Sequence, residues 1–414
     1  MDQYIVIISV IGVAALGMAW MPAFTKRTGV SYAILYTLAG VLIYLLFPHL
    51  LPPADPRKSL TYSMHLSELV VIISLMGTAI KIDRPLKWKS WQSPLRLVTI
   101  GMVGCIAIAA LLGYAFFNIG VASALLLGAV LAPTDPVLAS DVQVGPPNEN
   151  VRFETKFALT AEAGMNDSLA FPFVLLAIML CNMGVKADVN LWEWLGYNVV
   201  LRMVVGLVVG YLIGKLLGYI IFTMSDKFNV LETRDGFVAL SLTLMVYGIT
   251  ELLHGYGFVA VFVAGLTLRN YEVGHKYHDK LHAFTDQSER IMLAIVLILF
   301  GGSLLSGVLA GLTWPMVVFS LMFLLLIRPL TSYLSLMACK QVHSAEKWVI
   351  SFFGIRGMGS IFYMAYAMKE AKFPYANELW TIVTFTILLS ILIHGLTATR
   401  VMKYMEARFA KEIR

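Results

Sequence analysis

Two carboxylates interrupt the apolar stretch Leu159-Thr-Ala-Glu162-Ala-Gly-Met-Asn166-Asp167-Ser-Leu-Ala-Phe-Pro-Phe-Val174, which continues as far as Cys181. An apolar run of this length is typical of a membrane-spanning helix. On insertion scales, an ionisable group in the middle of a bilayer costs roughly 2.5–3.5 kcal/mol. A chain keeps such groups there only where they have partners or a function. This stretch therefore decides both the fold class and the place to look for a site.

The composition places the chain in a membrane. Hydrophobic residues make up 59% of the 414 residues and charged residues only 14%, whereas a soluble protein carries about a quarter charged residues. The net charge of +6 is explained by basic loops, so it does not indicate a nucleic-acid partner. Buried thiols and no disulfide framework are expected, because all three cysteines fall in apolar runs: Cys105, Cys181 and Cys339.

Apolar runs of roughly 17–25 residues predict an all-α, polytopic membrane protein with about thirteen transmembrane helices. The predicted spans centre near Ala14, Ile43, Ile73, Ala107, Leu126, Phe171, Gly210, Leu242, Val263, Ile298, Phe323, Phe362 and Leu389. No basic residue precedes the first run, which we interpret as a retained span and not a signal peptide. Residues 401–414 are expected to form a short cytoplasmic tail.

The distribution of basic residues predicts the orientation. Most of the 31 Lys and Arg residues fall in alternate loops, and these face the cytoplasm if the N-terminus lies outside. The opposite loops hold few of them: Arg57, Lys58, Lys186, Lys369 and Lys372. A missed span would scramble this alternation in every later loop. We therefore expect a multi-pass protein of the cell (inner) membrane, with its N-terminus outside and its C-terminus in the cytoplasm.

The fifth span is interrupted at Pro133-Thr134-Asp135-Pro136. Each proline removes a backbone donor and clashes with the preceding turn, so a straight helix cannot pass through this segment. At membrane depth a broken helix is tolerated only where it is buried in protein or lines a cavity. Its freed carbonyls, the Thr134 hydroxyl and the Asp135 carboxylate are oxygen ligands of the kind that hard cations prefer. A simple proline kink with a capping aspartate is the alternative.

Helical geometry separates the two carboxylates of the opening stretch. Glu162 and Asp167 are five residues apart, so on a helix they point about 140° apart and differ by roughly 7.5 Å in height. They therefore cannot form one paired-carboxylate site. Asn166 lies one turn from Glu162, near its face, while small residues surround Asp167 and let another backbone approach closely.

The eleventh and twelfth spans each carry an arginine. Three glycines surround Arg356 in Gly354-Ile-Arg356-Gly357-Met-Gly359, which predicts a second broken helix. Arg356 keeps its proton and needs a buried anion, for which Glu162 is the expected partner. Arg328 precedes Pro329; it either caps or snorkels or binds the carbonyls of a broken helix, and both interpretations stay open.

The two interrupted spans occupy equivalent positions. Spans 5 and 12 are each the fifth of a six-span unit if spans 1–6 and 8–13 are repeats, and a single linker span then inverts the second repeat. Interrupted helices at corresponding positions point to the site of a secondary transporter. We expect one membrane transporter domain, with repeat 1 at about 1–182, the linker span at about 195–223 and repeat 2 at about 233–400.

Two further features allow alternative interpretations. Glu68 either lies at a helix start, where the helix dipole favours an acid, or contributes to an ion path. His275, His278 and His282 share one helical face in a polar segment. We interpret that segment as a solvated cytoplasmic helix, with pH sensing as the alternative, and we expect no metal site.

The chain resembles the first monovalent cation:proton antiporter family, the NhaP-like and sodium–hydrogen exchanger group. The matching motifs occur in the same order in corresponding spans: Thr134-Asp135-Pro136, Glu162-x-x-x-Asn166-Asp167, Arg328-Pro329 and Gly354-x-Arg356-Gly357. The resemblance implies a six-helix transport core, a dimerisation domain and a homodimer in the membrane.

The resemblance also implies roles for the site residues. Asp167 would bind the cation and the proton, with Asn166, Thr134 and Asp135 beside it, and Glu162 with Arg356 would form the buried ion pair. One departure is Ala163-Gly-Met, where family members often have Ser-Leu-Leu. Ser168 or a carbonyl would then replace the missing serine as a ligand.

The expected function is secondary antiport of Na⁺, and also Li⁺, against H⁺, with a role in pH homeostasis. We expect electroneutral 1:1 exchange by alternating access, because Asn166 stands where electrogenic relatives have a second aspartate. K⁺/H⁺ exchange is the alternative. An ion channel or sensor, or an intramembrane aspartyl protease, is more remote, since such a protease would show Gly-x-Gly-Asp in place of Gly-Met-Asn-Asp167. No enzymatic activity and no cofactor are expected; the partners are the ions and membrane lipid.

Overall fold

The structure is a computed structural model that describes residues 3–48, 51–146, 154–183, 190–224, 236–271 and 277–412. These residues form helices and no strands, which confirms the all-α class. Every predicted span centre lies in a helical segment. The first half contains α1 (Gln3–Met18), α2 (Met21–Thr28), α3 (Tyr32–Leu46), α4 (Leu60–Lys81), α5 (Gln92–Arg96), α6 (Met102–Phe117), α7 (Val121–Leu131), α8 (Glu154–Met183) and α9 (Leu191–Glu193).

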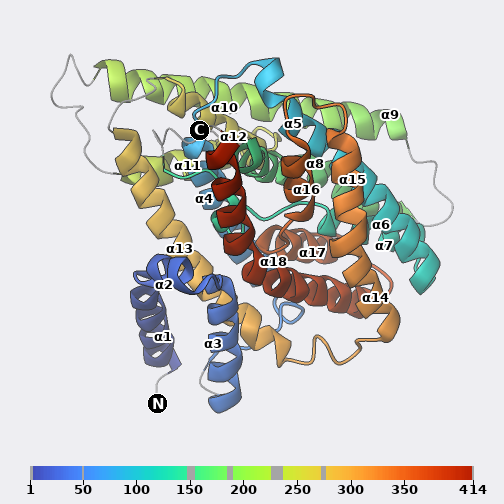
Figure 1. Ribbon diagram of the computed structural model, residues 1–414. Coiled ribbons are helices and arrows are strands. Elements are labelled where there is room, and N and C mark those ends of the chain that lie inside the picture. The colour runs from blue at the N-terminus through green and yellow to red at the C-terminus, as the bar shows by residue number, and fades with distance from the viewer. Residues whose placement is uncertain are drawn as a thin grey trace.

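The second half of the described chain is likewise helical (Figure 1). They are α10 (Arg202–Gly218), α11 (Phe237–Leu252), α12 (Gly257–Arg269), α13 (Tyr277–Leu304), α14 (Trp314–Met322), α15 (Arg328–Leu336), α16 (Ser344–Phe352), α17 (Met358–Glu370) and α18 (Ala376–Glu412). Short π-helical turns join several of them without a loop, as between α14 and α15.

Seven helical segments of the described chain are long and apolar enough to cross a membrane. They are Leu60–Lys81, Trp88–Phe117, Glu154–Met183, Leu191–Met224, Tyr277–Leu304, Trp314–Leu336 and Ala376–Arg408. Helices α1 and α2 pass the same test as a pair bent by 53°, and α3, α7, α11 and α12 are shorter apolar helices. The chain is therefore a multi-pass membrane protein.

The helices pack as two groups. In the first, α4 and α13 contact each other and α13 contacts α3, while α12 joins α4 to α10. The second group contains α6, α7, α8 and α14 to α18, with α7 packed between α6 and α8. Figure 1 shows α1–α3 (blue) on one flank and α6, α7, α14 and α15 on the other. Helix α17 contacts α4, α7 and α8, so it lies where the groups meet.

A stripe of glycines allows α10 and α12 to pack closely. Gly206, Gly210, Gly214 and Gly218 recur every fourth residue and are all buried. A Cβ atom on Gly206 would lie 2.7 Å from the carbonyl oxygen of Tyr256 on the α12 side. Small residues at this spacing let two membrane helices approach backbone to backbone.

Both predicted helix breaks are confirmed. Helix α7 ends at Leu131 and no helix resumes before residue 140, as expected from the two prolines. Helix α16 ends at Phe352 and α17 begins at Met358, with a non-helical segment between them. The two breaks meet, because the backbone N–H of Asp135 donates to the carbonyl of Ile355 at 2.8 Å.

Two polar segments of the chain are helical. Helix α18 continues to Glu412, so the tail at 401–414 is helical as far as residue 412. Helix α13 begins at Tyr277, and His278 is 0% exposed against the Phe222 ring, with ring centroids 5.1 Å apart. The prediction of a solvated helix is therefore wrong for His278, while His275 lies outside the described residues.

Candidate functional site

Asp135 stabilises the crossing of the two broken helices. Its Oδ1 accepts hydrogen bonds from the backbone N–H groups of Val137 at 2.8 Å and Leu138 at 3.0 Å. Its Oδ2 accepts one from the N–H of Met358, the first residue of α17. A carboxylate at a helix N-terminus satisfies free N–H groups and favours the helix dipole. The segment is a break and not the simple kink of the alternative interpretation, and Asp135 caps α17, the helix that follows the other break.

Arg356 caps the C-terminal end of α7. Its guanidinium donates to the carbonyl of Ala132, where α7 ends, and a cation there offsets the negative end of the helix dipole. Its backbone N–H donates to Ser390 at 2.8 Å, and its guanidinium carbon lies 5.2 Å from the centroid of the Phe323 ring. The first break therefore supplies a negative charge, Asp135, to the N-terminus of α17, and the second supplies a positive charge, Arg356, to the C-terminus of α7.

The buried ion pair joins Glu162 to Arg328. Two parallel hydrogen bonds, of 2.7 and 2.8 Å, connect the Arg328 guanidinium to the two Glu162 oxygens, and both side chains are only 2% exposed. The prediction that Arg356 is the partner of Glu162 is wrong. Sequence reasoning could not choose between two buried arginines on neighbouring spans. Arg356 binds a broken-helix carbonyl, which is one of the two roles that the sequence allows for Arg328.

Asp167 is buried without a hydrogen-bond partner. The residue is 1% exposed, and neither carboxylate oxygen has a partner among the described residues. A Cβ atom on Gly359 of α17 would lie 2.7 Å from Oδ1, so this glycine makes room for the carboxylate. Buried polar atoms are normally satisfied, and an unsatisfied one calls for a functional explanation or a ligand.

Asn166 connects α8 to the first break. Its Nδ2 donates to the Thr134 hydroxyl at 2.6 Å, while its Oδ1 has no partner among the described residues. The structure thus brings together Thr134, Asn166 and the adjacent Asp167, as predicted. The carboxylate oxygens, the Asn166 carbonyl oxygen and the Thr134 hydroxyl are the ligand types that could hold a monovalent cation. The described residues contain no group of three or more His, Cys, Asp or Glu side chains placed to bind a metal.

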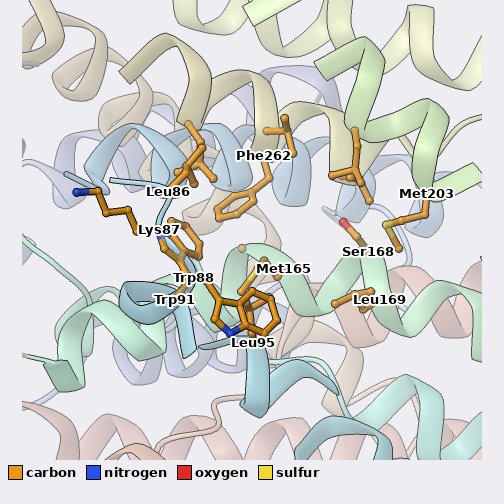
Figure 2. A pocket seen from close by; sticks show the side chains of 15 residues that line it. Leu86, Lys87, Trp88, Trp91, Leu95, Met165, Ser168, Leu169, Met203 and Phe262 are labelled. Carbon is orange, nitrogen blue, oxygen red and sulfur yellow. The ribbon is translucent and has the colours of Figure 1, made fainter. Parts of the chain in front are cut away.

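Three cavities surround this region. A polar cavity of about 400 Å³ is lined by Lys81, His282, Asp286 and Glu289 and by Ser140 beyond the first break. An apolar crevice of about 350 Å³ lies between α8, α10 and α12; Figure 2 shows Trp91, Met165, Leu169, Met203 and Phe262 around it, with Ser168 at one end. Because its walls are apolar, this crevice is a poor route for an ion.

The third cavity, of about 70 Å³, contains Glu68, Ser168, Arg202 and Glu251. Glu68 lies more than two turns inside α4, and the helix-dipole effect is confined to the first turn, so that explanation for Glu68 does not hold. Its carboxylate accepts a hydrogen bond from Tyr247 and lies 2.9 Å from His65. Ser168 lines both this cavity and the apolar crevice, and its buried hydroxyl has no partner among the described residues.

Comparison with known proteins decides the family. The family model described as "Sodium/hydrogen exchanger, transmembrane" matches residues 12–404. The chain belongs to the sodium/hydrogen exchanger family. This is a family of transporters, as expected from the motifs around Asp167, and the recognition of a monovalent cation:proton antiporter family from those motifs is confirmed.

Relatives within the exchanger family differ in the cation that their names give. The chain is 24% identical over 386 residues to the K(+)/H(+) antiporter NhaP2 of Shewanella oneidensis, covering 91% of this chain and 62% of that protein. It is 23% identical to a Na(+)/H(+) antiporter of Saccharomyces cerevisiae, covering 87% and 40%. The chain thus spans about three-fifths of the length of the first relative and less of the second.

A solved structure has the same fold. The sodium proton antiporter MjNhaP1 from Methanocaldococcus jannaschii, at pH 8, matches with a TM-score of 0.72 at 20% identity, over 96% of this chain and 98% of that one. At this identity the match supports the fold of the exchanger family and not the chemistry of the site.

Sequence reasoning missed three parts of the site. Tyr363 donates a hydrogen bond to the backbone carbonyl of Asp167, and Ser360 donates to the carbonyl of Val130 at 2.8 Å. Both lie on α17 and tie it to α8 and α7. The two are three residues apart on a helix and therefore lie near one face, which was a usable signal. Nothing in the sequence pointed to Ser390 as the acceptor for Arg356.

Proposed function

We propose that the protein is a secondary antiporter that exchanges a monovalent cation for a proton, with Asp167 as the carboxylate that both ions share. The observation that carries the proposal is the buried Asp167 side chain, whose two oxygens have no partner among the described residues. It lies beside the crossing of two broken helices, where small cations and protons are bound in secondary transporters.

The chemistry is a competition for one negative charge. A carboxylate in a site without water is destabilised in its charged form. Either a proton or a cation neutralises it, and binding of one excludes the other. The neutral site crosses the membrane barrier more easily than the charged one. Exposure of Asp167 to alternate sides then couples the two fluxes.

The ligand set assigns different roles to the predicted site residues. Asp167, the Asn166 carbonyl oxygen and the Thr134 hydroxyl are the direct ligands, and Ser168 is a further candidate because its hydroxyl has no partner among the described residues. Asp135 is a positioning residue, because its oxygens already accept three backbone N–H groups. An aspartyl protease is disfavoured for the same reason, since Asp135 is not available to share a water molecule with Asp167.

We propose Na⁺, with Li⁺, as the cation and an electroneutral exchange of one ion for one proton. Asn166 contributes no charge, so a single carboxylate is neutralised by either ligand. Exchange of K⁺ for H⁺ is the second candidate, because relatives carry both names. Cavity size and ligand field decide this selectivity.

The proposed architecture has thirteen spans in two inverted repeats, about 1–182 and 233–400, joined by a linker span at about 195–223. The long helices, the bent α1–α2 pair, the four shorter apolar helices and the broken α16–α17 pair support that number. We also propose a homodimer in the cell membrane with the N-terminus outside. Alternating access would move the α6–α8 and α14–α18 group against the other helices.

Reconstitution into liposomes tests the function. A proton-sensitive dye inside the vesicles should report proton movement when NaCl, LiCl or KCl is added in turn, with choline chloride as the control. Asp167→Asn should abolish the signal while the protein still folds. Exchange that survives this substitution overturns the assignment. Cation flux without proton counter-flux would indicate a channel, and a dependence on membrane potential would refute electroneutrality.

A further inference from the structure

The polar cavity lies between the two helix groups. Lys81 at the end of α4, together with His282 and Glu289 of α13, lines it from the first group. Ser140, which follows the first helix break, and Thr399 of α18 line it from the second. Its volume of about 400 Å³ is within the range of small-ligand sites. The cavity thus reaches Ser140, five residues after Asp135.

Glu289 is a buried carboxylate of this cavity that the proposed exchange at Asp167 does not use. The residue is 6% exposed. Ser74 donates to its Oε1 at 3.3 Å, but Oε2 has no hydrogen-bond partner among the described residues. A Cβ atom on Gly77 would lie 3.1 Å from Oε2, so the helix facing this oxygen carries no side chain there.

The neighbouring charges do not neutralise Glu289 by direct contact. Asp286 forms its own ion pair with Arg290, at 2.7 Å. Lys81 lines the same cavity as Glu289, yet no ion pair within 4 Å joins the two in the described chain. His282 is a further titratable neighbour on the cavity wall. Glu289 thus lines the cavity and keeps one unpaired oxygen, Oε2, which is buried beside Gly77 of α4.

We propose that Glu289 is a second binding site for the transported cation, which captures the ion in the polar cavity before it reaches Asp167. This inference rests on the proposed antiport function. One carboxylate, the Ser74 hydroxyl and water form a ligand set of low charge, which suits a monovalent cation better than a divalent one that needs several carboxylates. The Lys81 ammonium repels the bound ion, so the site binds weakly and releases its ion readily.

Exchange kinetics test the capture site. Glu289→Gln should raise the cation concentration for half-maximal exchange roughly tenfold, the effect of removing one charge at a partly screened contact, and leave the rate at saturating cation nearly unchanged. Lys81→Gln should lower the cation concentration for half-maximal exchange. Asp286→Asn removes a charge from the same cavity that is already paired, and should have little effect. An unchanged half-maximal concentration in Glu289→Gln, or an equal shift in Asp286→Asn, overturns the proposal.

A binding experiment separates this proposal from the exchange function. In Asp167→Asn protein, which lacks the proposed exchange site, NaCl or KCl should still raise the unfolding temperature relative to choline chloride, because a ligand that binds only the folded state stabilises it. The double variant Asp167→Asn/Glu289→Gln should lose this stabilisation. Absence of stabilisation in Asp167→Asn refutes the capture site even if the wild-type protein exchanges ions. Conversely, absence of exchange by the wild-type protein refutes the proposed function and with it the capture role, while stabilisation of Asp167→Asn by NaCl or KCl would still identify a cation site at Glu289.

Discussion

Arg328 holds Glu162 through two parallel hydrogen bonds of 2.7 and 2.8 Å, in a place where both side chains are 2% exposed. The pair joins α8, which carries Asp167, to α15. A Cβ atom on Gly354 would collide with the Arg328 side chain, so the second broken helix passes directly over the pair. Glu162 is therefore a structural residue of the site, although it is not among the proposed ligands.

Glu162→Gln should destabilise the protein by about 3–5 kcal/mol, because it leaves the Arg328 charge buried without an anion. The double variant Glu162→Gln/Arg328→Met should recover much of this loss. Thermal unfolding in detergent of the two single variants and the double variant measures the coupling between the residues. Normal stability of Glu162→Gln combined with lost transport would instead place Glu162 among the ion ligands.

Asp135→Asn and Asp167→Asn should affect stability in opposite ways. In Asp135→Asn, an NH₂ group replaces one carboxylate oxygen. This group then faces a backbone N–H, either that of Met358 or those of Val137 and Leu138, so two donors oppose each other. The expected loss of folding free energy is about 1–3 kcal/mol. Asp167→Asn breaks no hydrogen bond of the carboxylate in the described chain and removes a buried charge, so stability should be equal or higher. Unfolding temperatures of the two variants, measured in choline chloride, test the contrast.

The fold class and both helix breaks could be predicted from the sequence because they follow from local chemistry. Apolar run lengths indicate the helices, and two prolines three residues apart or three glycines within six residues disfavour a continuous helix, so Pro133, Pro136 and Gly354–Gly359 marked the breaks. Helical geometry also separated Glu162 from Asp167 correctly. These conclusions need only the order of residues within one helix.

Partner choice between helices could not be obtained in this way. Arg328 and Arg356 are both buried and both close enough to α8 to compete for Glu162, and only the packing of α15 decides in favour of Arg328. The burial of His278 against Phe222 likewise depends on how the start of α13 packs against the π-helical turn Tyr219–Met224 that follows α10. A polar composition predicted solvent, but tertiary contacts determined the result.

Gly210→Ala should destabilise the α10–α12 contact by about 1–3 kcal/mol, the usual effect of overpacking. A Cβ atom at this position would collide with the backbone of Ala260 on α12. Gly248→Ala on α11 is the matched control, because nothing lies within 4 Å of its added Cβ. The control should be neutral or stabilising by up to about 1 kcal/mol, since alanine favours helix more than glycine does. Thermal unfolding of both variants decides whether the glycine stripe is a packing requirement.

Acid stability should depend on the Asp55–Arg57 pair in the loop between α3 and α4. Burial alone would raise the pKa of Asp55, but the Arg57 side chain and its backbone N–H lower that pKa below its usual value, through bonds of 2.9, 2.8 and 3.0 Å. A lowered folded-state pKa stabilises the protein above the unfolded pKa, near pH 4, and this stabilisation is lost as the pH falls through the folded value. Arg57→Met should therefore move the acid-unfolding midpoint upward by about half to one pH unit. Lys58→Gln, which removes an exposed neighbouring charge, should move it less; equal shifts would show that net loop charge, and not the pair, controls acid stability.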